Sequence, residues 1–384
     1  MRIVQANAVY DPAARTPAAL LDSYRTLTEW SSSVARAGAE VAVVQRFHTT
    51  TRIEHDGIPY QFIADKHTPW LSTKDSPRDF INAIAAEKPD VVHVNGLIFP
   101  QAVAGIQRAL GARAAIVVQH HGGEFPIHGS GLVGWWRRQR WRGGLAAADA
   151  ISFTSAEQAD PWRAAGVLGE QRIIEIVEAS TTLRAVNRER ARAAVGATGD
   201  PLILWVGRLT TNKDPLAVLD GLERALPQLP RAQVMMVFGD DTLLGAVDAR
   251  VRASAVLSSA VVLSGRVAHD EMPNFYSAAD IFVSGSHSEG SGYALIEAMS
   301  AGLVPIVTDI PSFRVIAGDC GGRWSPGNAE QLAEVLVKLV NAGLEPQKAT
   351  ARARFEQTLS WEAVAQRTVR EYQTLFEAKR AVAG

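Results

Sequence analysis

The segment 289–302 combines residue types that suit the binding of a phosphorylated ligand. Two carboxylates, Glu289 and Glu297, flank a turn that contains Gly290 and Gly292. An apolar run precedes the turn, and the residues after it have the pattern of a helix. Backbone N–H groups at a helix start bind anions, and glycine lets a ligand approach the backbone. Carboxylates on either side of the anion would bind hydroxyl groups. The layout therefore fits a diphosphate with a sugar at each end, which is a nucleotide sugar.

A second segment, 207–215, supplies two cations. Arg208 follows an apolar run that predicts a strand, and Lys213 lies one loop further on, before Asp214 and Pro215. These last two residues suit the N-cap and the first position of a helix. Arg208 is therefore expected at the carboxyl end of a parallel strand, where open α/β sheets bind ligands. The two cations would neutralise a diphosphate, or they are an ordinary pair of exposed loop cations that contributes little to stability.

Short apolar runs alternate with helical patterns along nearly the whole chain. Strands are predicted at 2–6, 40–46, 58–64, 90–94, 114–119, 149–153, 172–177, 202–206, 233–238, 261–264, 280–284 and 304–308. Helices are predicted at 17–37, 75–87, 97–110, 155–165, 214–226, 242–255, 270–278, 292–301, 328–341 and 360–380. Strands that are apolar on both faces and separated by helices indicate an α/β fold with parallel sheets covered on both sides. One face of the last helix would be formed by Trp361, Val364, Thr368, Tyr372 and Leu375.

Length and composition narrow the class of protein. A chain of 384 residues suits two domains, and the charged run at 187–190 places their boundary near 179–200. The formal net charge of -1 provides no overall field to attract nucleic acid. No apolar stretch reaches the ~18–20 residues that span a bilayer, and no apolar signal-peptide core follows Met1. A cytoplasmic location is therefore expected.

Together the two ligand-binding segments resemble the family 4 glycosyltransferases of the GT-B fold. The family motifs are Gly207-Arg208 followed by Lys213, and two glutamates with seven residues between them, here Glu289 and Glu297. A third match is 264–267, before 276–280. The resemblance implies two Rossmann-like domains that face each other across a cleft. These would be 1–180 on the acceptor side and 181–359 for the nucleotide sugar, with a helix at 360–384 that crosses back to the first domain. It also implies a retaining reaction without metal or cofactor, with the nucleotide sugar as co-substrate.

The same resemblance assigns roles to individual residues. Arg208 and Lys213 would bind the donor diphosphate, Glu289 the transferred sugar, and Glu297 the ribose hydroxyls. Further donor contacts would come from Gly207, Val267, Gly290, Ser291, Gly292 and Tyr293, with the backbone around Val267 facing the base. Ser291 stands where the family usually has Phe, which changes the side chain but keeps the N–H group.

Two histidines, His120 and His121, end the predicted strand at 114–119. By resemblance His121 would touch the sugar near the reacting carbon, with His120 as the second choice. The alternatives are a metal site with Glu124 as third ligand, or two histidines satisfied within a loop. The family's glycine pair after the first strand is missing between Asn7 and Leu21. The acceptor therefore stays unidentified among saccharides, lipid-linked molecules and small molecules.

Residues 135–142 contain four arginines and three tryptophans. An acceptor groove could stack sugars on Trp and pair phosphate with Arg, and Arg138 is the candidate contact. A peripheral helix at the inner face of the membrane would have the same composition. The third interpretation is an ordinary helix of the first domain.

Two other kinds of function stay open. One is a different enzyme on the same fold, either a phosphorylase that uses free phosphate or an epimerase of nucleotide sugars. The other is a protein that binds a nucleotide sugar without turnover. Release of a nucleoside diphosphate would separate a transferase from these alternatives.

Overall fold

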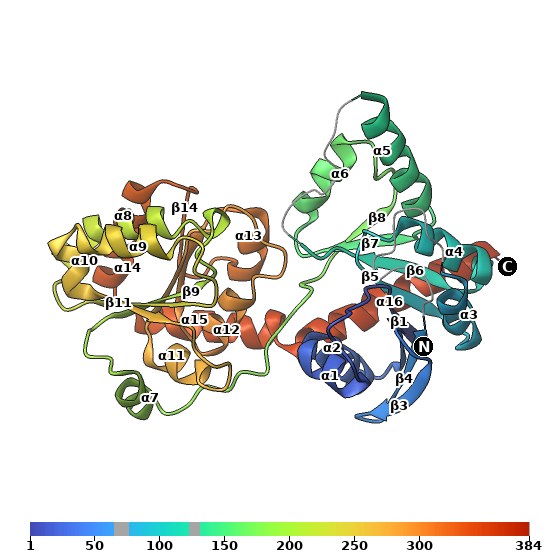
Figure 1. Cartoon of the computed structure of the whole chain (residues 1–384), viewed down its shortest axis with the longest axis horizontal. Helices are drawn as coiled ribbons and strands as arrows, with labels where there is room; N and C mark the ends of the chain where they lie inside the picture. Colours follow the sequence, from blue (N-terminus) through green and yellow to red (C-terminus); the bar gives the residue numbers. More distant parts are fainter. Residues whose placement is uncertain (65–76, 123–130, 384) are drawn as a thin grey trace. The chain divides into compact units, whose positions relative to one another are not determined.

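The computed structural model describes residues 1–64, 77–122 and 131–383. The chain forms two compact units (Figure 1). The first consists of Met1–Ala179 together with Trp361–Gly384, and the second of Ser180–Ser360.

The first unit is built on an eight-stranded sheet in the order β3-β4-β2-β1-β5-β6-β7-β8. Its strands are β1 (Arg2–Asn7), β2 (Glu40–Phe47), β3 (Thr51–His55), β4 (Ile58–Ala64), β5 (Val91–Asn95), β6 (Ala115–Gln119), β7 (Ala150–Phe153) and β8 (Arg172–Glu175). All neighbours pair in parallel except β3, which is antiparallel to β4. Every residue of β6 and β7 is buried, as expected for strands covered on both faces.

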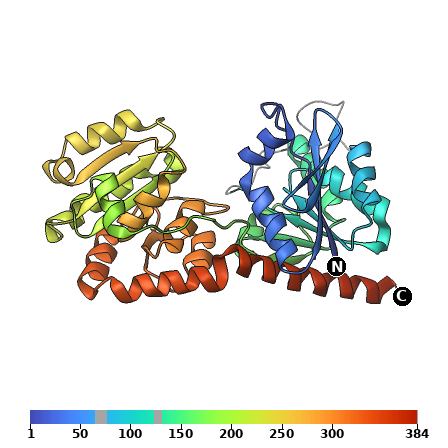
Figure 2. The same cartoon turned by 90° about the horizontal axis from the view of Figure 1, so that it is seen from below.

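Seven helices of the described residues belong to this unit. They are α1 (Pro17–Ser23), α2 (Arg25–Arg36), α3 (Arg78–Ala86), α4 (Pro100–Leu110), α5 (Gly131–Leu145), α6 (Asp160–Ala164) and α16 (Trp361–Ala383). The helix predicted at 17–37 is divided at Tyr24, whose φ of −118° and ψ of 57° are not helical. The predicted inner face of α16 is confirmed, because Trp361, Val364, Thr368, Tyr372 and Leu375 are all buried. Figure 2 shows α16 as the long helix that ends at the C-terminus beside the first unit.

The second unit contains a six-stranded, all-parallel sheet in the order β11-β10-β9-β12-β13-β14. Its strands are β9 (Leu202–Gly207), β10 (Gln233–Phe238), β11 (Val261–Gly265), β12 (Ile281–Ser284), β13 (Val304–Thr308) and β14 (Gly322–Trp324). The helices are α7 (Arg188–Val195), α8 (Pro215–Ala225), α9 (Leu244–Arg252), α10 (Ala255–Ala260), α11 (Met272–Ala278), α12 (Tyr293–Ser300), α13 (Pro311–Ala317), α14 (Ala329–Ala342) and α15 (Glu345–Arg354). The prediction of two α/β domains with parallel sheets is confirmed.

Strand order fixes where each sheet can bind a ligand. In the second unit the order reverses between β9 and β12, and in the first unit it reverses between β1 and β5. Loops that leave the carboxyl ends of such neighbouring strands go to opposite faces of the sheet and leave a crevice between them. The loops after β9 and β12 carry the two segments that the sequence singles out.

Candidate active site

In the second unit, the loops after β9 and β12 are joined by hydrogen bonds. Asn212 donates from Nδ2 to the carbonyl of Ser288 at 3.0 Å, and its Oδ1 accepts from the Ser288 N–H at 3.0 Å. The His287 N–H donates to the Asn212 carbonyl at 2.8 Å. Gly285 permits this approach, because a Cβ there would lie 3.0 Å from the Asp214 carbonyl. The two segments predicted to bind one diphosphate therefore lie side by side.

Lys213 and Glu289 meet at this junction. The Lys213 Nζ forms an ion pair with Glu289 Oε1, and their side chains are only 19% and 14% exposed. Ser286 also donates to Glu289 Oε1, at 2.8 Å. The expectation of an exposed loop cation is therefore wrong for Lys213, because the loop after β12 covers it. Asp214 caps α8 as predicted, by accepting from the Ala217 N–H, and Pro215 is the first residue of that helix.

Arg208 lies at the end of β9 and is exposed. Hydrogen bonds from Thr242 lower the pKa of the Asp240 carboxyl, and the positive charge of Arg208 adds to this effect. Arg208 therefore lies close to the carboxyl end of β10 as well. Gly207, the last residue of β9, is half-buried, and Val267 lies half-buried just beyond β11.

The helix α12 begins at the turn that the glycines predict. Gly292 is its N-cap, with a φ of 61°. A side chain at Gly292 would be strained and would place its Cβ 2.6 Å from Ile316 Cδ1, so the turn requires glycine. Of the other predicted backbone contacts, Gly290 is buried, Ser291 half-buried and Tyr293 exposed.

Glu297 lies on α12 and has a partner that the sequence argument missed. The Tyr276 hydroxyl, on α11, donates to Glu297 Oε2 at 2.8 Å. Burial, together with the Glu297 charge, raises the pKa of Tyr276 well above its usual value, so the phenol stays a donor. The sequence places Tyr276 in the family match at 276–280, but that match does not indicate that its hydroxyl contacts Glu297.

In the first unit, His121 follows β6 at the carboxyl edge of the sheet. Its Nδ1 lies 2.6 Å from Oε2 of Glu178, a carboxylate whose side chain is only 2% exposed. Its Nε2 lies 3.1 Å from Oδ1 of Asn95, the last residue of β5. Neither partner was predicted, since each lies more than twenty residues away in the chain.

His120 points to the core instead. Its ring packs 4.8 Å from the ring of Phe153 and 5.8 Å from that of Trp162, between ring centroids. Burial lowers the pKa of His120 to about 4, so the ring is neutral near pH 7. His120 and His121 therefore have different surroundings, and Glu124, the third ligand of the metal alternative, lies outside the described residues. In the parts of the chain that the structure describes, no three His, Cys, Asp or Glu side chains form a group that could hold a metal ion.

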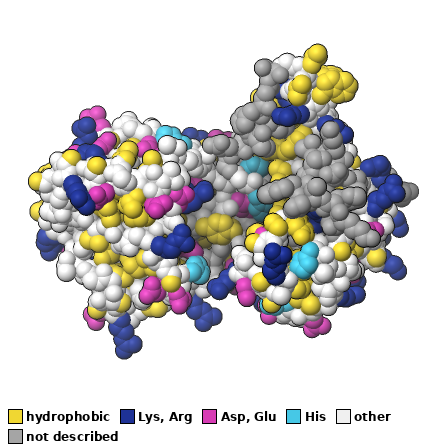
Figure 3. Space-filling model, viewed as in Figure 1, with side chains coloured by type: hydrophobic (Ala, Val, Ile, Leu, Met, Phe, Trp, Pro, Cys, Tyr) yellow, Lys and Arg dark blue, Asp and Glu magenta, His cyan; other side chains and the backbone are white. Residues whose placement is uncertain are grey.

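The arginine–tryptophan stretch forms most of α5. Trp141 is buried against the unit, whereas Trp135 and Trp136 are 46% and 65% exposed. Leu132 and Val133, at the start of the helix, are 78% and 66% exposed. Figure 3 shows hydrophobic side chains gathered at this end of α5. Arg138, the candidate acceptor contact, is half-buried on the same helix.

Within residues 1–64, 77–122 and 131–383, no helix is long and apolar enough to cross a membrane.

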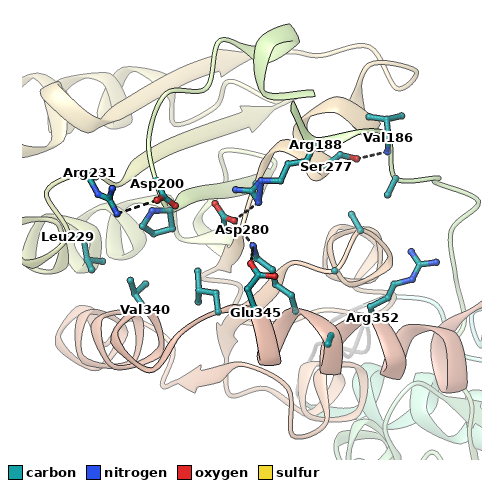
Figure 4. Close-up of a pocket in the computed structure, with 18 of the residues that line it drawn as sticks. Val186, Arg188, Asp200, Leu229, Arg231, Ser277, Asp280, Val340, Glu345 and Arg352 are labelled. Atoms are coloured by element: carbon teal, nitrogen blue, oxygen red, sulfur yellow. Dashed lines mark hydrogen bonds and ion pairs between the residues drawn. The ribbon is translucent and has the colours of Figure 1, made fainter. Parts of the chain in front are cut away.

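A cavity of about 930 Å³ lies in the second unit, at the opposite edge of its sheet. Its lining includes Pro201, Asp280 and Gly302, which precede β9, β12 and β13 (Figure 4). Asp280 is 2% exposed, and its Oδ1 lies 2.7 Å from both Arg188 Nη1 and Lys348 Nζ. These paired charges fasten α7 and α15 to the sheet. Among the described residues of this lining, none is a predicted site residue.

Two family models match this chain, one on each unit. "Glycosyl transferases group 1" matches residues 187–356, and "Glycosyl transferase 4-like domain" matches residues 24–176. The chain belongs to the family 4 glycosyltransferases of the GT-B fold, as the two motifs predicted, and it is a glycosyltransferase.

Relatives and solved structures agree with this assignment. The GDP-mannose:cellobiosyl-diphosphopolyprenol alpha-mannosyltransferase of Xanthomonas campestris is 27% identical over 302 residues, which cover 77% of each chain. Sucrose-phosphate synthase from Thermosynechococcus elongatus has the same fold, with a TM-score of 0.69 and 22% identity over 98% of this chain and 100% of that one. Anabaena HepE, solved in complex with UDP, also has a TM-score of 0.69, with 15% identity over 97% of this chain and 100% of the other.

Proposed function

We propose that the chain transfers a sugar from a nucleoside diphosphate sugar to an acceptor hydroxyl, with retention of anomeric configuration and without metal. The observation that carries this proposal is the Lys213–Glu289 pair beside the start of α12. A cation, a carboxylate and a helix N-terminus converge where the strand order reverses. This set matches a phosphate bonded to a sugar, because the cation and the helix end bind the phosphate while the carboxylate binds hydroxyls.

The placement of the side chains supports a role for each of them in donor binding. Lys213 and Arg208 would neutralise the diphosphate as it leaves, when its charge is greatest. Glu289, already held by Ser286, would accept hydrogen bonds from the transferred sugar. Glu297 would accept from the ribose hydroxyls while Tyr276 holds its other oxygen. The half-buried backbone near Val267 would face the base.

Retention and independence from metal are supported by the same residues. Two cations supply the positive charge that a metal ion would bring to a departing diphosphate. The departing phosphate could take the proton of the acceptor hydroxyl on the same face of the sugar, which preserves the configuration. No cofactor is needed for this reaction, since the nucleotide sugar is the co-substrate.

The acceptor side is assigned to the first unit, with His121 at the edge of its sheet and Arg138 as a further contact. A lipid-linked acceptor is favoured, because the Xanthomonas relative is named for a diphosphopolyprenol substrate and α5 exposes tryptophan beside arginine. The sequence between Glu124 and Asp149 contains four arginines and no carboxylate side chain. A cationic helix with exposed aromatic side chains suits the anionic inner face of a membrane.

A donor screen tests the proposal. Nucleotide sugars, beginning with GDP-mannose and UDP-glucose, would be compared by thermal shift, since a ligand at 100 times its Kd adds about 2.7 kcal/mol to the stability. The stabilising donor is then incubated with acceptors, and release of nucleoside diphosphate is measured with and without EDTA. Release of sugar phosphate with free phosphate as acceptor would indicate a phosphorylase. Binding without release across a broad panel of acceptors would indicate a binding protein.

A further inference from the structure

Asn212 lies in the loop after β9, immediately before Lys213, and its side chain contacts the loop after β12. Its Nδ2 donates to the Ser288 carbonyl at 3.0 Å. Its Oδ1 accepts from the Ser288 N–H at 3.0 Å and from the Ser288 hydroxyl at 3.1 Å. Because a backbone N–H only donates and a carbonyl only accepts, these partners determine the orientation of the Asn212 amide. The side chain therefore satisfies both backbone polar groups of Ser288.

Asp214, on the other side of Lys213, contacts the same loop. Its Oδ2 lies 2.9 Å from Nε2 of His287, while its Oδ1 caps α8. The His287 N–H also donates to the Asn212 carbonyl at 2.8 Å. Lys213 is thus flanked by two residues that are both attached to the segment immediately before Glu289.

The loop after β12 is also fixed on its other side. The Thr308 hydroxyl, at the end of β13, donates to the Ser286 carbonyl at 2.5 Å. The Ser286 hydroxyl donates in turn to Glu289 Oε1 at 2.8 Å. Thr308 and Ser286 are both fully buried. The Asn212 contacts therefore join a loop that is already attached to β13 to the loop that carries Lys213.

We propose that Asn212 is a positioning residue that holds the two halves of the donor site together before the donor binds. The inference rests on the proposed function, in which Lys213 binds the diphosphate and Glu289 the transferred sugar. These two side chains pair with each other in the unliganded chain, so they must exchange that contact for contacts with the donor. The hydrogen bonds of Asn212 involve neither side chain, and opening of the ion pair leaves them intact. Groups that are arranged in advance need no rearrangement during the reaction, which lowers its barrier.

Binding and turnover of Asn212→Ala test this role. The kcat should fall roughly 10–100-fold, since a displacement of about 1 Å near the reacting groups costs up to 10²-fold. In calorimetric titrations the affinity for the intact nucleotide sugar should fall, whereas that for free nucleoside diphosphate should stay close to the parent value. Added to Glu289→Gln, the substitution should cause little further loss of turnover, because the carboxylate that it positions is already absent. Losses that multiply, or equal weakening of both ligands, would overturn the proposal.

Two further variants separate positioning from a general loss of stability. Ser288→Ala removes only the hydroxyl bond to Asn212 and keeps both backbone bonds, so it should retain far more turnover than Asn212→Ala. Asn341→Ala removes an exposed asparagine from α14 in the same unit and should change neither turnover nor binding. A loss in Ser288→Ala as large as that in Asn212→Ala would contradict the role given to the backbone bonds.

Hydrogen exchange tests the link without turnover. In the unliganded full chain the amide protons of His287 and Ser288 should be protected, because both donate to Asn212. Asn212→Ala should remove the protection of the Ser288 amide. Exchange of that amide in the parent at the rate of an unfolded chain would refute the proposal. A protected Ser288 amide in a chain that releases no nucleoside diphosphate would refute the proposed function while supporting the link between the loops.

Discussion

Substitution of Lys213 is the sharpest test of the donor site. The side chain is expected to contribute both to the stability of the fold and to catalysis, and the two contributions can be measured separately. Its ammonium group pairs with Glu289 in the apo protein, and the proposal makes it the cation that stabilises the leaving diphosphate. Lys213→Ala should therefore lower kcat by roughly 10²–10³-fold, about 2.7–4 kcal/mol, which is the scale for loss of one charge-stabilising donor.

The same substitution should also affect folding. The pair is neither fully exposed, where it would contribute about 0–1 kcal/mol, nor fully buried, where breaking it would cost about 3–5 kcal/mol. Glu289 keeps its bond from Ser286, so an intermediate loss of about 1–2 kcal/mol is expected. At about 2–4 °C per kcal/mol for a unit of this size, Tm should fall by several degrees.

The assay must separate these two effects. Lys213→Met combined with Glu289→Gln removes both charges, so it should recover most of the lost stability but none of the turnover. Lys338→Ala removes an exposed cation from α14 in the same unit and should change neither. Nucleoside diphosphate release is measured at saturating donor, and unfolding is followed by circular dichroism. Near-normal turnover in a folded Lys213→Ala protein would refute the assignment of Lys213 to the diphosphate.

Four further predictions concern the donor site, the metal and α5. Glu297→Ala should weaken the binding of free nucleoside diphosphate in calorimetric titrations, whereas Glu289→Ala should leave that binding nearly unchanged and lose turnover; equal weakening would contradict their division of roles. Tyr276→Phe should weaken the same binding by only about 1 kcal/mol, the value of one hydrogen bond. Activity should survive EDTA, and a complete loss reversed only by added Mg²⁺ or Mn²⁺ would overturn the metal-free reaction. Replacing the four arginines of α5 by Gln should reduce binding to anionic vesicles by about 1 kcal/mol per cation without changing nucleotide binding. Unchanged vesicle binding and acceptor kinetics would make α5 an ordinary surface helix. The replaced residues are Arg137, Arg138, Arg140 and Arg142.

The sequence predicted the central strands well because each is apolar on both faces. It missed β3, an edge strand in which no residue is fully buried, and β14, which has only three residues. The charged run at 187–190 was used only to place the domain boundary near 179–200, whereas the structure begins α7 there. Asn187 caps that helix by accepting from the Arg190 N–H, and only Ala191 is buried, so no apolar stripe signals the helix.

Site residues were predictable where local spacing determines their geometry. Gly292 and the start of α12 follow from the order of residues after β12, and the Asp214 cap follows from its position before Pro215. The covering of Lys213 was not predictable, since it depends on a loop more than seventy residues later in the chain.

The contacts that sequence reasoning missed share one physical cause. A polar side chain at the edge of a parallel sheet is partly removed from water, so it needs a hydrogen-bonding partner. Glu178 meets His121, Tyr276 meets Glu297, and Tyr372 meets His93 across separations that no local motif spans. These partners set which nitrogen or oxygen of a functional group remains available. A motif can therefore identify a reactive residue, but its charge and orientation depend on contacts that only the folded chain provides.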